Sequence, residues 1–130
     1  CRARVQADLL RYAANPVILA GDTHSSWAFD LHDDQKNRVG VEVGTPGISS
    51  PGMDSYLPVQ PDILQAAFLD SSPELVEVET QNRGWAEVEF TPKSMRTRWH
   101  YVSSVLDRNY AVTTSQPLVC RAGERAFSNT

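Results

Sequence analysis

The sequence predicts an α/β fold, with some α+β-like character, built around a mixed β-sheet. A helical pattern over residues 2–14 leads by a short loop into an apolar strand at 17–21, the order of elements found in α/β layers. Alternating apolar and polar residues over 75–103, interrupted by turn residues, predict antiparallel hairpins toward the C-terminus. Together these patterns favour a sheet that contains both parallel and antiparallel strands.

The first helix and the first strand are separated by Asn15-Pro16. Apolar residues recur at helical spacing before this pair, namely Val5, Leu9, Leu10, Tyr12 and Ala13. We expect the helix to end there, because the residue before a proline avoids the helical backbone conformation. The following run from Val17 to Ala20 is typical of a strand that is covered on both faces.

The middle of the chain predicts two antiparallel strands, a loop and a short helix. Residues 27–32 alternate, with Trp27, Phe29 and Leu31 on one face and Ala28 among polar residues on the other. After the polar turn at 33–38, a second strand is expected at 39–43. The Gly-, Pro- and Ser-rich residues 44–58 predict a loop, and residues 62–69, near Pro61, predict a helix.

Three further antiparallel strands are predicted at 75–80, 85–91 and 95–103. Asn82-Arg-Gly84 would form the first connecting turn, and Thr91 to Ser94 the second. Glu87 and Glu89 would face Arg96 and Arg98 as cross-strand neighbours. The periodicity is weak from Asn109 onward, so we expect this tail to pack loosely.

Size and composition limit the class of protein. The 130 residues suffice for one domain, and no linker divides them. A net charge of −4 without a basic stretch argues against nucleic-acid binding. No apolar run approaches the roughly 20 residues that span a bilayer, and no signal peptide is visible. Cys1 and Cys120 could form a disulfide, but their spacing does not argue for one, and we favour two unpaired thiols.

The segment Gly21-Asp-Thr-His24 carries the strongest chemical signal. It follows the apolar strand directly, and in open α/β sheets binding sites lie beyond the carboxyl ends of strands. A carboxylate and an imidazole two residues apart suit a metal ion. Simpler roles are also open: Asp22 could cap a turn or a helix beginning at Ser25 or Ser26, and His24 could be a hydrogen-bonded loop residue.

Three ordered stretches resemble the PhoD-like alkaline phosphatases and phosphodiesterases of the metallophosphoesterase superfamily. The first is Val17-Ile-Leu-Ala-Gly-Asp-Thr-His-Ser-Ser-Trp27, and the second is Val41-Glu-Val-Gly-Thr-Pro-Gly-Ile-Ser-Ser-Pro-Gly52. The third is Asn82-Arg-Gly-Trp85 with Thr91-Pro92 and Arg98-Trp-His-Tyr-Val102. The matches cover about residues 15–105, and the resemblance implies half of a metallophosphoesterase sandwich and hydrolysis of phosphate mono- or diesters.

The resemblance also implies metal ligands. Most metallophosphoesterases have Gly-His-x-His where PhoD-like proteins, and this chain, have Gly-Asp-x-His. By this alignment His24 would bind the Fe³⁺ of the family and Asp22 the neighbouring Ca²⁺, which prefers oxygen ligands. Both residues would hold cations rather than act as the nucleophile.

The rest of the family's ligand set is missing. Its early Asp, bridging Asp, Asn motif and Cys ligand lie N-terminal to this stretch in the family, and only 20 residues precede Gly21. The chain also starts with Cys1 instead of Met. We therefore expect residues 1–130 to be a single C-terminal fragment of a PhoD-like domain, inactive by itself and not necessarily metal-binding. It would belong to an extracytoplasmic enzyme, and alone it would self-associate to cover an exposed sheet face.

Several other residues are candidates near the site. Thr23, Ser25 and Ser49 could support the ligands or bind substrate, and Glu42 could accept a hydrogen bond from His24. Arg83 could bind an anion, although hydrogen bonding to turn carbonyls is the role we favour. A rival hypothesis of another class is a stand-alone β-rich binding or assembly domain, in which Gly-Asp-Thr-His is only a turn.

Overall fold

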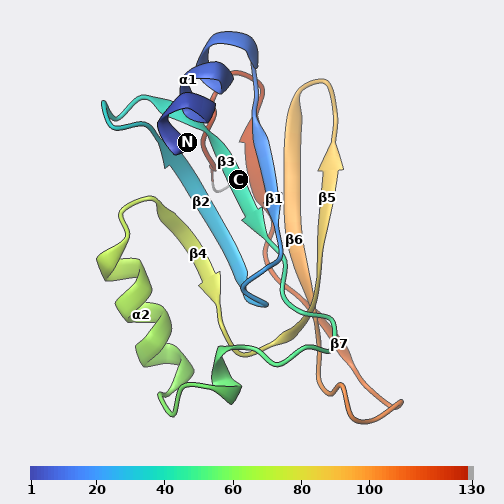
Figure 1. Ribbon diagram of the computed structural model, residues 1–130. Coiled ribbons are helices and arrows are strands. Elements are labelled where there is room, and N and C mark those ends of the chain that lie inside the picture. The colour runs from blue at the N-terminus through green and yellow to red at the C-terminus, as the bar shows by residue number, and fades with distance from the viewer. Residues whose placement is uncertain (129–130) are drawn as a thin grey trace.

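The computed structural model describes residues 1–128 as two β-sheets packed face to face, with two helices at the periphery (Figure 1). The helices are α1 (Arg2–Tyr12) and α2 (Pro61–Ser71), and a single 3-10 turn, η1, spans Met53–Ser55. The strands are β1 (Val17–Ala20), β2 (Ser26–His32), β3 (Arg38–Gly44), β4 (Leu75–Glu79), β5 (Arg83–Phe90), β6 (Ser94–Val102), β7 (Val112–Thr114) and β8 (Leu118–Arg121).

The first sheet is mixed, as the sequence predicts. Its strand order is β1-β3-β2-β4, with β1 parallel to β3 and the other pairs antiparallel. Strands β2 and β3 form the hairpin expected around the polar turn at 33–38. The parallel pair arises because the chain leaves β1, folds back through β2 and returns in β3 beside β1. The α/β class with a mixed sheet is therefore confirmed.

The second sheet is entirely antiparallel. The hairpin of β5 and β6 has the predicted register, with Glu87 opposite Arg98 and Glu89 opposite Arg96. The Arg98 guanidinium donates to the Glu87 carboxylate at 2.8 Å. The free edge of β6 pairs with β7 near one end and with β8 near the other.

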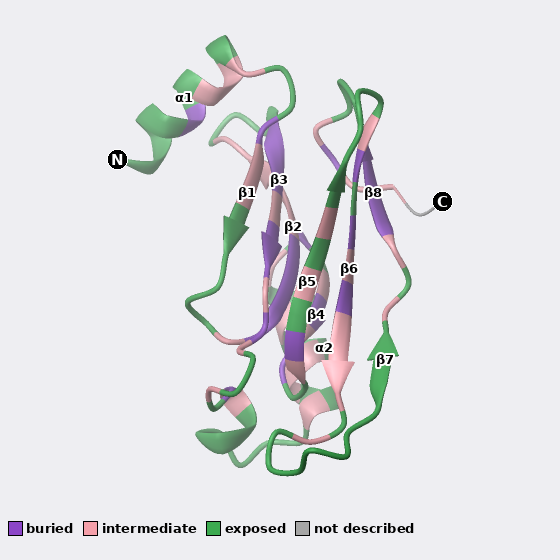
Figure 2. Cartoon of the chain, turned by 90° about the vertical axis from the view of Figure 1, so that its right-hand side faces the viewer, coloured by how far each residue is buried: buried purple, intermediate pink, exposed green. Residues whose placement is uncertain are grey.

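The main core lies between the two sheets. It contains Ala28, Val41 and Val43 of the first sheet and Met95, Trp99, Leu118 and Cys120 of the second. Figure 2 shows the buried bands of β2, β3, β6 and β8, which contrast with the exposed β7. Two polar contacts also join the sheets: Trp99 donates its indole N–H to the Gly44 carbonyl at 2.8 Å, and the Tyr101 hydroxyl donates to Ser26 Oγ at 3.1 Å.

Helix α2 covers part of the outer face of the first sheet. Trp27, Leu75 and Val78 form a second apolar cluster there, against which Phe68 of α2 packs. The Phe68 ring meets the Trp27 ring edge to face, with 5.1 Å between their centroids. The predicted alternation of β2 is confirmed, because Trp27 faces this cluster while Ala28 faces the main core. Pro61 lies at the first turn of α2, where its missing N–H costs no hydrogen bond.

Strand β1 is not covered on both faces, contrary to the prediction from its apolar run. It is an edge strand whose only partner among residues 1–128 is β3, and Leu19 is 60% exposed. Helix α1 was also predicted wrongly in two respects. It ends at Tyr12, and its buried residue is Gln6, which donates to the His32 carbonyl at 2.9 Å, while Val5 and Tyr12 are exposed. Gln6 meets the sheet at the end of β2, whereas Val5 and Leu9 border an open hollow instead of packing closely on the sheet.

Two further predictions are wrong in the C-terminal half. Strand β4 pairs with β2 and not with β5, so Asn82-Arg-Gly84 crosses between the sheets instead of forming a hairpin turn. The tail beyond Asn109 forms β7 and β8 and buries Leu118, Val119 and Cys120. These strands have three and four residues, too few for a period of two to become visible between Pro, Gly and Ser.

Neither helix among the described residues is long enough to cross a membrane. The cysteines are both free thiols, Cys1 exposed and Cys120 buried in the core.

Candidate functional site

Residues Gly21 to His24 form a tight turn between β1 and β2. The His24 N–H donates to the Gly21 carbonyl at 3.3 Å, which closes the turn. The alternative that Asp22 caps a helix at Ser25 or Ser26 is wrong, because β2 begins at Ser26. The turn itself fits either role left open by the sequence, since a turn can also present metal ligands. The environment of each side chain is therefore the more informative evidence.

His24 is held in a defined orientation. Its Nδ1 lies 2.9 Å from the Pro51 carbonyl oxygen. A carbonyl only accepts hydrogen bonds, so Nδ1 carries the proton and the Nε2 lone pair is available. Metal-bound histidines usually have this arrangement, with the second ring nitrogen bonded to an acceptor that fixes the tautomer. The backbone of His24 has a φ of 55°, an uncommon left-handed conformation for a residue with a side chain.

Asp22 is exposed and faces a different part of the surface. It lines an open hollow of about 290 Å³ on the outer face of the first sheet, together with Thr23, Trp27 and Glu42. Its carboxylate is thus accessible to a cation from solvent. The two candidate ligands have different neighbours, His24 the loop at Pro51 and Asp22 the hollow.

The smaller polar residues of the motif are mainly structural. Thr23 Oγ1 accepts a hydrogen bond from the Trp27 indole N–H at 2.7 Å, which fixes the turn on the sheet. Ser25 is fully buried, and its hydroxyl donates to the Thr23 carbonyl at 3.5 Å. Ser25 therefore cannot touch a substrate in this conformation. Ser49 is exposed in the loop, where contact with a substrate stays a prediction.

In this structure the acceptor beside His24 Nδ1 is the Pro51 carbonyl and not Glu42. Glu42 lies on β3 opposite Phe29 and Ile18, on the sheet face that also forms the hollow near Asp22. Burial raises the pKa of its carboxyl group, and the Arg2 charge opposes this shift. A half-buried carboxylate without a strong cationic partner is a group that a bound cation would stabilise.

The other two histidines lie elsewhere. His32 is at the end of β2, with Nδ1 3.7 Å from the Glu74 carboxylate. His100 stacks on Trp85, and its Nε2 lies 2.9 Å from Glu87 in the second sheet. His100 is therefore a packing residue, and His32 ends a strand.

Within residues 1–128, no three or more His, Cys, Asp or Glu side chains are grouped so that they could hold a metal ion. The residues present fit part of a site: one imidazole with a fixed tautomer and one accessible carboxylate. That Pro51 supplies the acceptor could not be predicted from the sequence. A backbone carbonyl carries no residue signature, and only the position of Pro51 in the Ser-Ser-Pro-Gly stretch pointed to this loop.

The family model for PhoD-like phosphatases matches residues 2–99, and the chain belongs to that family. A solved structure described as "Structure of PhoD" is similar, with a TM-score of 0.78, 22% sequence identity and 98% of this chain covered. The chain spans only 24% of that protein's length. No curated protein matches the sequence.

Proposed function

We propose that this chain supplies two metal ligands, Asp22 and His24, to an enzyme that hydrolyses phosphate mono- or diesters. The observation that carries the proposal is the hydrogen bond from His24 Nδ1 to the Pro51 carbonyl. It leaves Nε2 free to bind a metal in a protein whose family consists of PhoD-like phosphatases. Bound cations would supply Lewis-acid activation of the phosphate ester and of the attacking water.

Each residue has a separate task in this proposal. His24 holds one cation through Nε2, and its fixed ring limits the conformations in which that cation can sit. Asp22 holds a second cation through a carboxylate oxygen, exposed at the edge of the hollow. Their different surroundings suit ligands of two adjacent cations better than a chelate of one. Neither residue is proposed as the nucleophile.

The chemistry of the donors suggests which metals bind. An imidazole suits a transition metal, for which we propose Fe³⁺, and a carboxylate suits Ca²⁺. Two donors do not complete either coordination sphere. We therefore propose that residues 1–130 are the C-terminal part of a longer, exported enzyme that contributes the other ligands, and that the isolated chain is inactive.

Replacing each ligand in the protein of natural length tests the proposal. Wild type, Asp22→Ala and His24→Ala would be compared in the hydrolysis of a chromogenic phosphomonoester and a chromogenic phosphodiester. Iron and calcium would be measured in the same samples. We expect both variants to lose most activity, His24→Ala with a loss of iron and Asp22→Ala with a loss of calcium. The relative rates on the two substrates would indicate the preferred ester.

Matched controls come from residues of the same type outside the site. His32→Ala removes an imidazole beside Glu74, and Asp34→Ala removes an exposed carboxylate from a polar turn. Both should keep metal and activity. Normal activity and metal content in His24→Ala would refute the assignment. A wild-type protein without metal or activity would instead favour the second hypothesis, a binding or assembly domain in which Gly-Asp-Thr-His is only a turn.

A further inference from the structure

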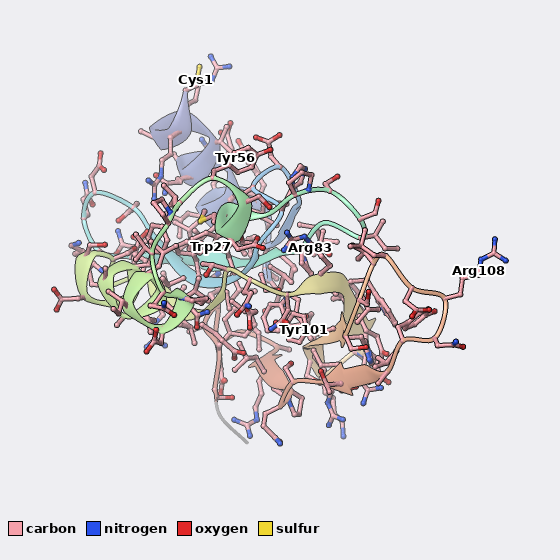
Figure 3. All side chains as sticks on the ribbon, turned by 90° about the horizontal axis from the view of Figure 1, so that it is seen from below. Cys1, Trp27, Tyr56, Arg83, Tyr101 and Arg108 are labelled. Atoms are coloured by element: carbon pink, nitrogen blue, oxygen red, sulfur yellow. The ribbon has the colours of Figure 1, made fainter. Side chains whose placement is uncertain are left out.

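We infer that Arg83 is a positioning residue for His24, acting through the loop of residues 45–54. This inference rests on the proposed function, because it concerns the side chain that would bind the metal. Arg83 lies at the start of β5, in the second sheet, whereas His24 precedes β2 of the first. Seen from below, Arg83 lies near the centre of the molecule, while Arg108 projects from its margin (Figure 3).

The Arg83 guanidinium holds the loop at two points. Nε donates to the Ser50 carbonyl at 2.7 Å, and Nη2 donates to the Asp54 carboxylate at 2.8 Å. The third nitrogen, Nη1, donates to the Gln81 carbonyl, which fixes the guanidinium plane relative to its own strand. The Arg83 side chain is only 13% exposed. Hydrogen bonds between charged groups are stronger than those between neutral groups, so the contact with Asp54 holds the loop strongly.

The hydrogen bonds of Arg83 affect the position of His24 through two adjacent peptide groups of the loop. Arg83 binds the Ser50 carbonyl, and the next carbonyl, that of Pro51, accepts the hydrogen bond from His24. The proline ring fixes φ of Pro51, so only ψ is left to change the relation between the two carbonyls. We therefore expect a shift of the Ser50 carbonyl to move the acceptor of His24.

The start of β5 binds the loop at further points. The Gly84 N–H donates to the Gly47 carbonyl at 3.2 Å, and the Ala86 N–H donates to Thr45 Oγ1 at 3.1 Å. Gly47 also packs beside His24, since a Cβ on Gly47 would lie 3.3 Å from the Cβ of His24. The loop therefore lies between β5 and the turn at Gly21 to His24, and it contacts both. Within residues 1–128, the ion pair of Arg83 with Asp54 is the only charged contact to the loop.

These contacts decide between the two roles that the sequence left open for Arg83. All three guanidinium nitrogens already donate within the protein, and Asp54 neutralises the charge. An anion would have to displace these partners, so hydrogen bonding to carbonyls is the role that the structure supports. The planar fork of arginine reaches three acceptors at once, which the single ammonium of lysine cannot reproduce.

The functional consequence concerns the tautomer of His24. An unrestrained neutral imidazole samples both tautomers, and the one with a proton on Nε2 cannot bind a metal through that atom. The Pro51 carbonyl favours the Nδ1–H form, and Arg83 keeps that carbonyl in place. Loss of Arg83 should therefore populate the other tautomer and weaken metal binding, without removing any ligand.

A spectroscopic test separates this role from general stability. Metal-free protein of natural length would be labelled with ¹⁵N-histidine, and the His24 ring signals would be assigned by their loss in His24→Gln. We expect the wild type to show one Nδ1–H tautomer and Arg83→Met to show a mixture of both. The affinity for iron in Arg83→Met should fall about ten- to hundredfold, the usual effect of losing a group that orients a ligand.

Arg125→Met is the matched control. Arg125 also donates to backbone carbonyls, those of Ala13 at 2.7 Å and Ala14 at 3.1 Å, but it lies at the α1–β1 connection, away from the loop. It should leave the His24 signals and the iron affinity unchanged. Asp54→Asn removes the charge from one of the three acceptors of Arg83 with little change of side-chain shape. We expect a smaller change of the His24 tautomer ratio, in the same direction as for Arg83→Met. This variant serves as the test if Arg83→Met does not fold.

The outcomes distinguish the two proposals. An unchanged His24 tautomer in Arg83→Met or, should that variant not fold, in Asp54→Asn, would overturn the positioning role, as would the same shift in Arg125→Met. A wild-type protein that binds no metal overturns the proposed function. The tautomer comparison needs no metal, so it still decides whether Arg83 orients His24.

Discussion

The imidazole of His24 is bonded to the backbone of Pro51, 27 residues further along the chain, with Nδ1 2.9 Å from the carbonyl oxygen. This contact joins the turn at Gly21 to His24 to a loop that is itself held to the second sheet by Arg83. The orientation of one candidate ligand therefore depends on the packing of the two sheets. Substitutions far from the ligands should reach the site wherever they change that packing.

Trp99 provides the first prediction, because its indole makes one of the two polar contacts between the sheets described above. Trp99 is fully buried and donates to the Gly44 carbonyl, at the residue where β3 ends and the loop begins. Trp99→Phe should lower the free energy of unfolding by about 2–4 kcal/mol, since it leaves a cavity and removes a buried hydrogen bond. Urea denaturation of the purified protein measures this change.

Trp85→Phe is the comparison for that substitution. Trp85 lies on β5, is 39% exposed and makes no contribution to the core between the sheets. Trp85→Phe should therefore lower the free energy of unfolding far less than Trp99→Phe does. Equal losses in the two variants would mean that neither the burial of Trp99 nor its hydrogen bond to Gly44 makes it more important than Trp85.

The elements of this fold could be predicted where side-chain periodicity was long enough. The eight residues of β5 and nine of β6 gave a clear alternation, and the pairing of Glu87 with Arg98 followed from it. The partner of β4 could not be predicted in the same way. Its alternation fits any neighbouring strand, and only the packing of Leu75 and Val78 against Trp27 places it beside β2.

The candidate site was predictable only in its side chains. Asp22 and His24 have a motif, whereas the Pro51 carbonyl has none, and Glu42 was expected in its place. Arg83 was expected to bind carbonyls, but the sequence could not say that those of the loop at Ser50 were among them. Contacts between a side chain and a distant backbone depend on the complete fold, so spacing along the chain does not reveal them.

Thr97 provides a prediction of increased stability. Its side chain is fully buried on β6, and its Oγ1 has no hydrogen-bond partner among residues 1–128. Thr97→Val keeps the branched shape and removes the unpaired hydroxyl, so it should raise the free energy of unfolding by about 1 kcal/mol. Thr97→Ser keeps the hydroxyl and removes the methyl group, so it should be less stable than wild type. A lower midpoint of urea denaturation for Thr97→Val would show that the hydroxyl has a partner.

Glu42 provides a prediction about pH. Burial raises the pKa of its carboxyl above the ordinary value of 4.5, so the folded protein binds this proton more tightly than the unfolded chain. The contribution of Glu42 to stability is therefore greatest at low pH and falls as pH rises through the raised pKa. Glu42→Gln should be more stable than wild type at pH 7, and the difference should disappear below about pH 4.5.

Denaturation of Glu42→Gln and wild type across this pH range measures the effect. Glu89→Gln removes an exposed carboxylate from β5 and should change stability little at any pH. If bound calcium uses Glu42 as well as Asp22, the advantage of Glu42→Gln at pH 7 should reverse when calcium is added. An advantage for Glu42→Gln that persists unchanged at low pH would contradict the role of burial.

Gly52 provides the last prediction, because it leaves room for the Arg83 guanidinium. A Cβ on Gly52 would lie 2.8 Å from Nη1 of Arg83 and 3.1 Å from the Asp54 carboxylate. The end of an arginine side chain can usually move aside, but here each of its nitrogens is bonded. Gly52→Ala must therefore break at least one of these hydrogen bonds or shift the loop. We expect about 1–3 kcal/mol of lost stability, as for overpacking elsewhere, together with a mixture of His24 tautomers.

The exposed loop residue Ile48 supplies the control, since Ile48→Ala removes a large side chain from the same loop without touching Arg83. It should change neither the stability nor the His24 signals appreciably. The pair Gly52→Ala and Arg83→Met then forms a test of coupling. If Gly52 acts only by leaving room for Arg83, adding Gly52→Ala to Arg83→Met should cause little further change in the tautomer ratio. An additive effect of the two substitutions would mean that Gly52 shapes the loop independently of the guanidinium.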